Sequence, residues 1–168
     1  MKIYNQSGRS MIEMLGVLAI VGVLSAGGIA GYSMAMQSYK TNALIEKVQL
    51  IAQTARTVYK GNYDGISAQN LINTGKIADV SNPFGGVFNV RVCNWGTDEF
   101  VIETGSNKVP ADACTDILTT DWGRTGMFTE IVVGGNESNG FWAKNMPFTM
   151  SSVVSACKGA KTIKWIFR

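Results

Sequence analysis

The chain contains 168 residues, of which 46% are hydrophobic and only 16% are charged, whereas soluble domains carry about 25% charged residues. Histidine is absent, which excludes Ser-His-Asp triads, Cys-His dyads and His-ligated zinc sites. The three cysteines show no Cys-x-x-Cys spacing, so neither a zinc ribbon nor a thioredoxin-like motif fits. The sequence also contains no Walker lysine motif and no GxGxxG, and its carboxylates are scattered without an evident acid–base pair, so we expect no metal, no cofactor and no enzymatic activity. The net charge of +3 is spread along the chain without a basic cluster, which argues against nucleic acid as a partner.

A long uncharged segment follows a short polar stretch at the N-terminus. No charged residue occurs from Met14 to Tyr39. As a helix, residues 14–32 would span about 28 Å at ~1.5 Å per residue, which matches the hydrocarbon core of a bilayer. Lys2 and Arg9 precede the segment, so the positive-inside rule predicts a cytoplasmic N-terminus and a C-terminal domain across the membrane.

Glu13 lies at the N-terminal edge of this segment and needs an explanation. An ordinary secretory signal peptide rarely carries a carboxylate in its apolar region, and a plain membrane anchor has no use for one. Inside a membrane helix a carboxylate costs up to ~2.5–3.5 kcal/mol, so it is expected to be functional and to have a partner. The remaining alternative is that Glu13 only reaches toward the membrane interface.

Ahead of the apolar run, the chain reads Gly8-Arg-Ser-Met-Ile-Glu13-Met-Leu. Together with the apolar run after it, this stretch resembles the prepilin processing motif of type IV pilins and type II secretion pseudopilins. The resemblance implies that a membrane prepilin peptidase cuts between Gly8 and Arg9 and N-methylates the new amine at Arg9. It also implies that the apolar helix is retained and that Glu13 meets the amine of a neighbouring subunit. The first mature residue in the family is usually apolar, and Arg9 departs from that pattern.

Small residues recur along the apolar segment. Gly27 and Gly31 form a small-xxx-small motif, which permits close approach of two helices. Together with the processing motif, this predicts that the helix packs against sister helices. Each glycine also lowers helix propensity by ~1 kcal/mol, so any kink or melted segment in the assembled state is expected within residues 22–31.

The helix is expected to continue past the membrane to about Lys60, where a glycine-containing segment, residues 61–65, ends it. Apolar residues recur there at steps of three and four, which is typical of a helix with one buried side. They are Leu44, Val48, Ile51, Ala55 and Val58.

The rest of the chain predicts short elements. We expect a helix over 67–75 capped by Ser67, a hairpin of strands 87–94 and 99–104 with its turn at 96–98, a helix over 110–122, a strand over 128–133, a loop over 134–145, a helix over 150–157 and a strand over 161–168. A long helix against a small, mostly antiparallel sheet is an α+β arrangement.

This C-terminal pattern resembles type IVb pilins and their thin-pilus relatives. The matching features are Asn-Pro-Phe-Gly-Gly at 82–86, Val-Pro-Ala-Asp-Ala-Cys at 109–114 and Ala-Cys at 156–157. The resemblance implies a disulfide between Cys114 and Cys157 that closes the last loop, with Cys93 left as a lone thiol. A pair between Cys93 and Cys114 is the alternative.

The resemblance as a whole implies a structural pilin subunit with the type IV pilin fold. Its partners would be identical subunits in a filament, prepilin peptidase, the inner-membrane assembly machinery and, before assembly, the membrane. The precursor would lie in the bacterial inner membrane and the assembled pilus outside the cell. The alternatives are a minor pilin or pseudopilin, and a membrane-anchored binding module in which Gly8 and Glu13 are dispensable. The expected divisions are a leader at 1–8, a transmembrane assembly helix at 9–33, an amphipathic helix half at 34–60 and a globular head at 61–168.

Overall fold

The computed structural model describes residues 7–105, 108–123, 127–135, 140–142, 145–159 and 161–168. The chain forms two compact units, Met1–Ser38 and Tyr39–Arg168. The first helix, α1 (Ser7–Tyr59), supplies the helical part of the first unit and the opening element of the second.

In the first unit, α1 presents apolar side chains on every side. Each described side chain from Met11 to Ala35 is exposed, and the helix is long and apolar enough to cross a membrane. A helix that is apolar all round is stable only where water is excluded. This part of α1 therefore needs a bilayer or other protein around it.

In the second unit, α1 is amphipathic, as its periodicity predicts. Leu44, Val48, Ile51 and Ala55 are fully buried, while Val58 is half-buried. The helix ends at Tyr59, where Lys60 adopts a φ of 50° and its N–H donates to the carbonyl of Arg56 at 3.0 Å. The predicted helix end is confirmed.

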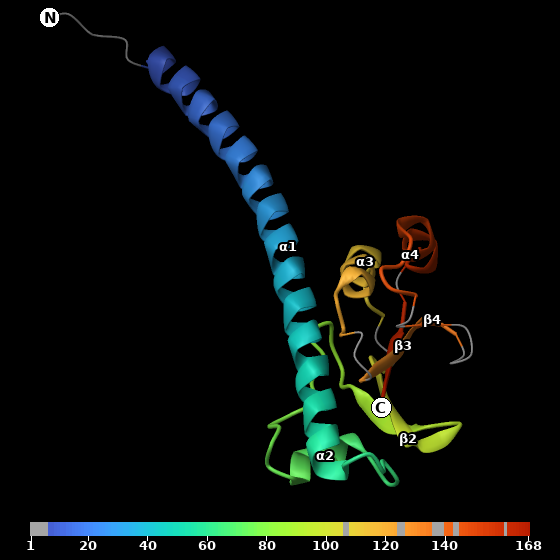
Figure 1. Ribbon diagram of the computed structural model, residues 1–168. Helices are drawn as coiled ribbons and strands as arrows, with labels where there is room; N and C mark the ends of the chain where they lie inside the picture. Colours follow the sequence, from blue (N-terminus) through green and yellow to red (C-terminus); the bar gives the residue numbers. More distant parts are fainter. Residues whose placement is uncertain (1–6, 106–107, 124–126, 136–139, 143–144, 160) are drawn as a thin grey trace, which may run out of the picture. The chain divides into compact units, whose positions relative to one another are not determined.

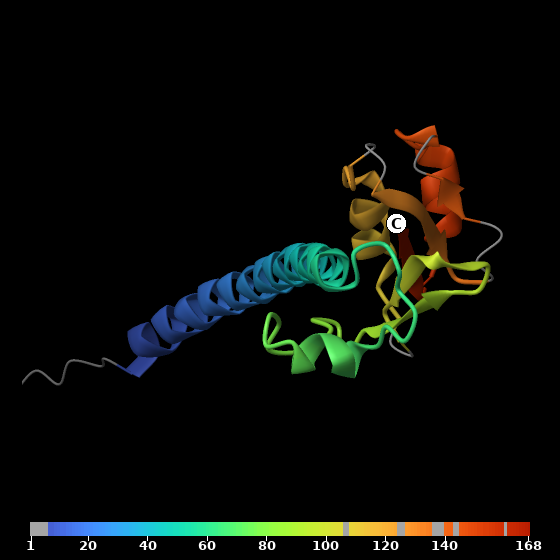
Figure 2. The ribbon, with the colours of Figure 1, turned by 60° about the horizontal axis from the view of Figure 1, so that its bottom comes forward.

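A five-stranded sheet forms the body of the second unit. Its strands are β1 (Asn89–Cys93), β2 (Gly96–Glu103), β3 (Phe128–Val133), β4 (Phe141–Trp142) and β5 (Ile163–Phe167). Their order in the sheet is β1-β2-β5-β3-β4, and all neighbours are antiparallel. Among the described residues, three short helices accompany the sheet: α2 (Ala68–Asn73), α3 (Ala111–Thr119) and α4 (Met150–Ala156). Helix α2 lies near the end of α1 in both views (Figure 1 and Figure 2). The predicted α+β class is confirmed.

The core lies between one face of the sheet and the helices. Its centre is aromatic, with the rings of Trp122 and Trp165 5.7 Å apart and those of Phe100 and Phe167 also 5.7 Å apart. A second, smaller buried cluster lies on the other face of the sheet. It consists of Cys93, Val101, Val132 and Ile166.

Three local predictions were wrong. The hairpin turn is Asn94–Trp95, because Cys93 already pairs with Gly96, so residues 96–98 belong to β2. The expected loop at 134–145 contains β4, a two-residue strand that pairs with Glu130 and Ile131 of β3. The predicted helix at 110–122 ends at Thr119, because the chain then turns back and the Trp122 indole donates to the carbonyl of Ile117 at 2.9 Å.

Candidate functional site

The exposed apolar helix of the first unit carries one carboxylate among its described residues. Glu13 is exposed and makes no hydrogen bond or ion pair with any residue that the structure describes. Gly8 and Arg9 lie at the start of α1, and the side chain of Arg9 lies outside the described part of the chain. At a spacing of four residues, Arg9 and Glu13 occupy the same side of the helix.

The glycines of this segment face open space. A Cβ added at Gly22, Gly27 or Gly31 would meet nothing within 4 Å, so no contact within the chain requires a glycine there. Glu13 and Gly31 are eighteen residues apart, which is five turns at 3.6 residues per turn. Gly27 lies one turn before Gly31 on nearly the same side, whereas Gly22 lies on the opposite side. The carboxylate and the small-residue motif therefore share one face of the helix.

A disulfide closes the C-terminal part of the second unit. Cys114 of α3 bonds to Cys157 at the end of α4, with their Cα atoms 5.6 Å apart and both residues buried. The predicted pair is confirmed and the alternative pair of Cys93 and Cys114 is wrong. Cys93 is buried outside the disulfide, in the cluster on the other face of the sheet.

A buried carboxylate on that second face was missed by sequence reasoning. Glu99 is only 5% exposed. Its oxygens accept hydrogen bonds from the indole of Trp95 at 2.9 Å and the hydroxyl of Thr129 at 3.2 Å, and Arg168 lies 3.5 Å away. These contacts join the hairpin turn to β3 and to the residue after β5. Because the partners are far apart in the chain, no local pattern could have revealed them.

Two titratable groups beside α1 are perturbed. Burial raises the pKa of Tyr63 above its ordinary value, and Arg56, which donates a hydrogen bond to the phenol oxygen, acts in the opposite direction. Hydrogen bonds from Ser81, and then one from Lys47 at 3.1 Å, lower the pKa of Asp79 to about 2. The pair between Lys47 and Asp79 ties α1 to the segment before β1.

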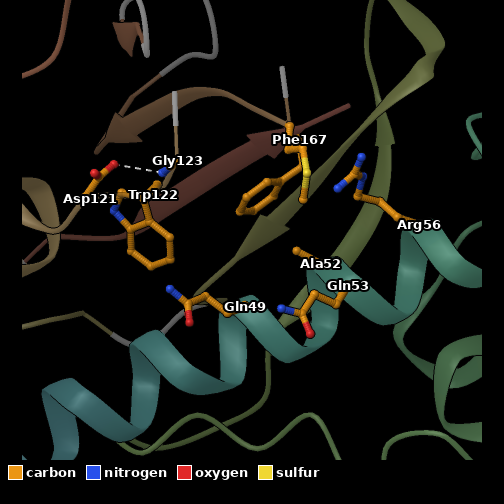
Figure 3. Close-up of a pocket in the computed structure, with 9 residues that line it drawn as sticks. Gln49, Ala52, Gln53, Arg56, Asp121, Trp122, Gly123 and Phe167 are labelled. Atoms are coloured by element: carbon orange, nitrogen blue, oxygen red, sulfur yellow. Dashed lines mark hydrogen bonds between the residues drawn. The ribbon is translucent and has the colours of Figure 1, made fainter. Parts of the chain in front are cut away.

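A cavity of about 310 Å³ lies between the second half of α1 and the end of β5 (Figure 3). The indole of Trp122 and the ring of Phe167 form its apolar walls, and α1 contributes Gln49 and Gln53. Its described lining contains two charged side chains, Arg56 and Asp121. Asp121 accepts a hydrogen bond from the backbone N–H of Gly123 at 2.9 Å, so its carboxylate shapes the turn after α3. The described lining offers no nucleophile paired with a base.

Comparison with known proteins gives one consistent result. The sequence pattern of the family described as PilS N terminal matches residues 38–168. The major structural subunit of bundle-forming pilus from Escherichia coli O127:H6 is 28% identical over 171 residues, covering 91% of this chain and 88% of that protein. The subunit of the same name from Escherichia coli O111:H- is 27% identical over 172 residues, with the same coverage. Among solved structures, the major type IV pilin PilA1 from Clostridium difficile aligns with a TM-score of 0.50 at 12% identity, over 79% of this chain and 96% of that one, and supports the fold.

Proposed function

Since this chain belongs to the PilS N-terminal family and is a type IV pilin, we propose that it is a structural subunit that polymerises through its N-terminal helix into a pilus. The observation that carries the proposal is the uncovered apolar helix of the first unit, with Glu13 and a small-residue motif on one face. The relatives named as major structural subunits of a bundle-forming pilus support the same function.

The proposed processing step is cleavage between Gly8 and Arg9, followed by N-methylation of Arg9. The step is supported by the glycine, by Glu13 five positions after it and by the apolar run that follows. Cleavage would remove Lys2 with the leader and create a new positive charge, the amine of Arg9. Mass spectrometry of the mature N-terminus tests this step directly.

Glu13 would then set the register between subunits. A carboxylate among apolar helices is strongly unfavourable without a partner, and breaking a buried ion pair costs about 3–5 kcal/mol. The amine of Arg9 on a neighbouring subunit would supply the partner, in competition with the Arg9 side chain of the same helix. Gly27 and Gly31, on the same face, would let the neighbouring helix approach closely.

Before assembly, the same helix would hold the subunit in the bacterial inner membrane with its N-terminus in the cytoplasm. The head, beginning in the second half of α1, would lie across the membrane, where disulfides form. The bond between Cys114 and Cys157 fits that compartment. Prepilin peptidase and the assembly machinery of the membrane would be its partners.

The test is to replace Glu13 with Ala in the full chain, in cells that contain the peptidase and the assembly machinery. We expect membrane-held subunits with the disulfide intact and few or no filaments in the sheared fraction. Normal filament yield from Glu13→Ala would overturn the proposal, since a membrane-anchored binding module does not need the carboxylate.

A matched pair of glycine variants tests the proposed packing face. Gly31→Leu places a bulky side chain on the face of Glu13, whereas Gly22→Leu places it on the opposite face, and both sites have open space in the single chain. Filament yield should fall for Gly31→Leu and stay close to normal for Gly22→Leu. Equal yields from the two variants would contradict the assignment of the face.

A further inference from the structure

A second cavity, of about 320 Å³, lies at the C-terminal end of α1 and is lined by three positively charged side chains, those of Arg56, Lys60 and Arg168. Arg168 already pairs with Asp98 at 3.2 Å and approaches Glu99 at 3.5 Å. The other two, Arg56 and Lys60, make no ion pair with any acidic residue that the structure describes. The remaining lining residues are Gly61 and Tyr63.

The two cations without an acidic partner lie four residues apart, at the end of α1 and just after it. Lys60 follows the last residue of α1 and has a φ of 50°, but its N–H still donates to the carbonyl of Arg56 at 3.0 Å, and both residues line the same cavity. The hydrogen bond from Arg56 to Tyr63 restrains the guanidinium, while Lys60 is exposed. The C-terminal end of a helix stabilises positive charge, which partly compensates Arg56 and Lys60. Both residues nevertheless line the open cavity without an acidic partner among the described residues. The cavity therefore suits an acidic group that carries two negative charges.

Such a group is present on α3. Asp112 and Asp116 are both exposed, lie one helical turn apart and make no ion pair with a described basic residue. The dipole of α3 stabilises the negative charge of Asp112 in the first turn of the helix. Asp116 lies beyond that turn and does not gain this stabilisation. The other acidic residues of the described head do not offer such a pair. Four of them already pair with a basic residue: Asp79, Asp98, Glu99 and Glu103. Glu130 is buried, and Glu46, Asp64 and Asp121 have no second acidic residue one helical turn away.

The acidic face of α3 and the basic cavity lie apart within one head. Figure 1 shows α3 beside α1 well before the point where α1 ends near α2. Within one molecule, Asp112 and Asp116 neither line the basic cavity nor form an ion pair with Arg56 or Lys60 among the described residues, whereas a second copy can place the two surfaces in contact. A contact between different patches on identical subunits does not close on itself unless the rotation forms a ring, and it otherwise generates a helical filament.

We propose that Asp112 and Asp116 of one copy bind Arg56 and Lys60 of the next copy in the filament. The inference rests on the proposed function as a polymerising subunit and adds a contact between heads to the contact between helices. Charge complementarity between two cations and two carboxylates identifies the occupant of the cavity as a second copy of this chain.

The test uses charge reversal in the full chain. Two variants, Arg56→Glu with Lys60→Glu and Asp112→Lys with Asp116→Lys, should each weaken association between subunits about tenfold, since two ion pairs become like-charge contacts. We expect a matching fall in sheared filaments, and recovery when all four substitutions are combined. Lys76→Glu with Asp64→Lys is the control, because both residues are exposed and lie outside the cavity, and it should leave the yield unchanged.

The outcomes separate this inference from the proposed function. Normal filaments from both reversed pairs, or no recovery in the combined variant, would overturn the inference while leaving the polymerising subunit in place. Binding of inorganic phosphate that is lost in the Arg56 and Lys60 variant, with filament yield unchanged, would assign the cavity to a free anion and would also overturn it. If a reversed variant fails to form the disulfide, the neutral pairs R56Q with K60Q and D112N with D116N replace it, with smaller losses expected.

Discussion

Reducing the disulfide between Cys114 and Cys157 should substantially lower the free energy of unfolding of the head. Cys114 and Cys157 are 43 positions apart, and the loop-entropy relation gives about 4 kcal/mol for a loop of that length at 25 °C. The bond joins α3 to α4, and Val153 on α4 is fully buried in the core. If reduction frees α4, the core contacts of Val153 are weakened as well. With a urea m-value of ~2 kcal/mol per M, a loss of ~4 kcal/mol lowers the unfolding midpoint by ~2 M.

The assay is urea unfolding of the detergent-solubilised full chain, oxidised and reduced, followed by tryptophan fluorescence. Trp122 and Trp165 report on the core because both are buried there. Cys93→Ala is the control, since Cys93 lies outside the disulfide and its variant should respond to reduction as the wild type does. A difference below ~1 kcal/mol between oxidised and reduced protein would refute the chain-entropy reasoning.

Three further predictions concern the head. Ile51→Ala removes a fully buried side chain from α1 and should cost about 2–5 kcal/mol in the free energy of unfolding; its neighbour Leu50, 44% exposed, is the matched control, and an equal loss from Leu50→Ala would show that the buried side is misassigned. The lowered pKa of Asp79, about 2 against an ordinary 3.8, means that the folded state favours the charged form. The stabilisation is therefore complete above pH 4 and lost as the pH falls through 2. Because the side chain is 53% exposed, Asp79→Asn should cost at most ~1 kcal/mol at pH 7, and urea titrations should show the difference between wild type and variant vanish near pH 2. A Cβ at Gly140 would lie 1.8 Å from a carboxylate oxygen of Glu130, so Gly140→Ala should lower stability by about 1–3 kcal/mol, and an unchanged urea midpoint would contradict that placement.

Sequence periodicity predicts the main helices and strands of the head, but not their exact ends or the contacts between distant residues. The spacing of Leu44, Val48 and Ile51 predicts the buried side of α1 because a helix repeats every 3.6 residues. The pairing of Cys114 with Cys157 came from the family resemblance, since three cysteines alone leave the choice open.

The misplaced elements share a physical cause. A two-residue strand such as β4 has no periodicity to detect, and its existence depends on hydrogen bonds to β3. The turn at Asn94–Trp95 was assigned two residues too late because Gly96 and Asp98 are themselves turn-favouring residues. Glu99 contacts Arg168, which lies 69 positions later in the sequence, and such a contact follows from the order of the strands in the sheet rather than from a local pattern.

The two edge strands of the sheet, β1 and β4, determine how easily one head could pair with the sheet of a neighbouring head. An unpaired strand edge is a template for the strand of a neighbour and can lead to aggregation. In the described sheet, β1 is interrupted by a bulge between Val92 and Cys93 and carries Arg91, while β4 is only two residues long. Neither edge strand presents a long, regular row of unpaired backbone groups. Heads can therefore pack side by side at high local concentration without forming a continuous intermolecular sheet.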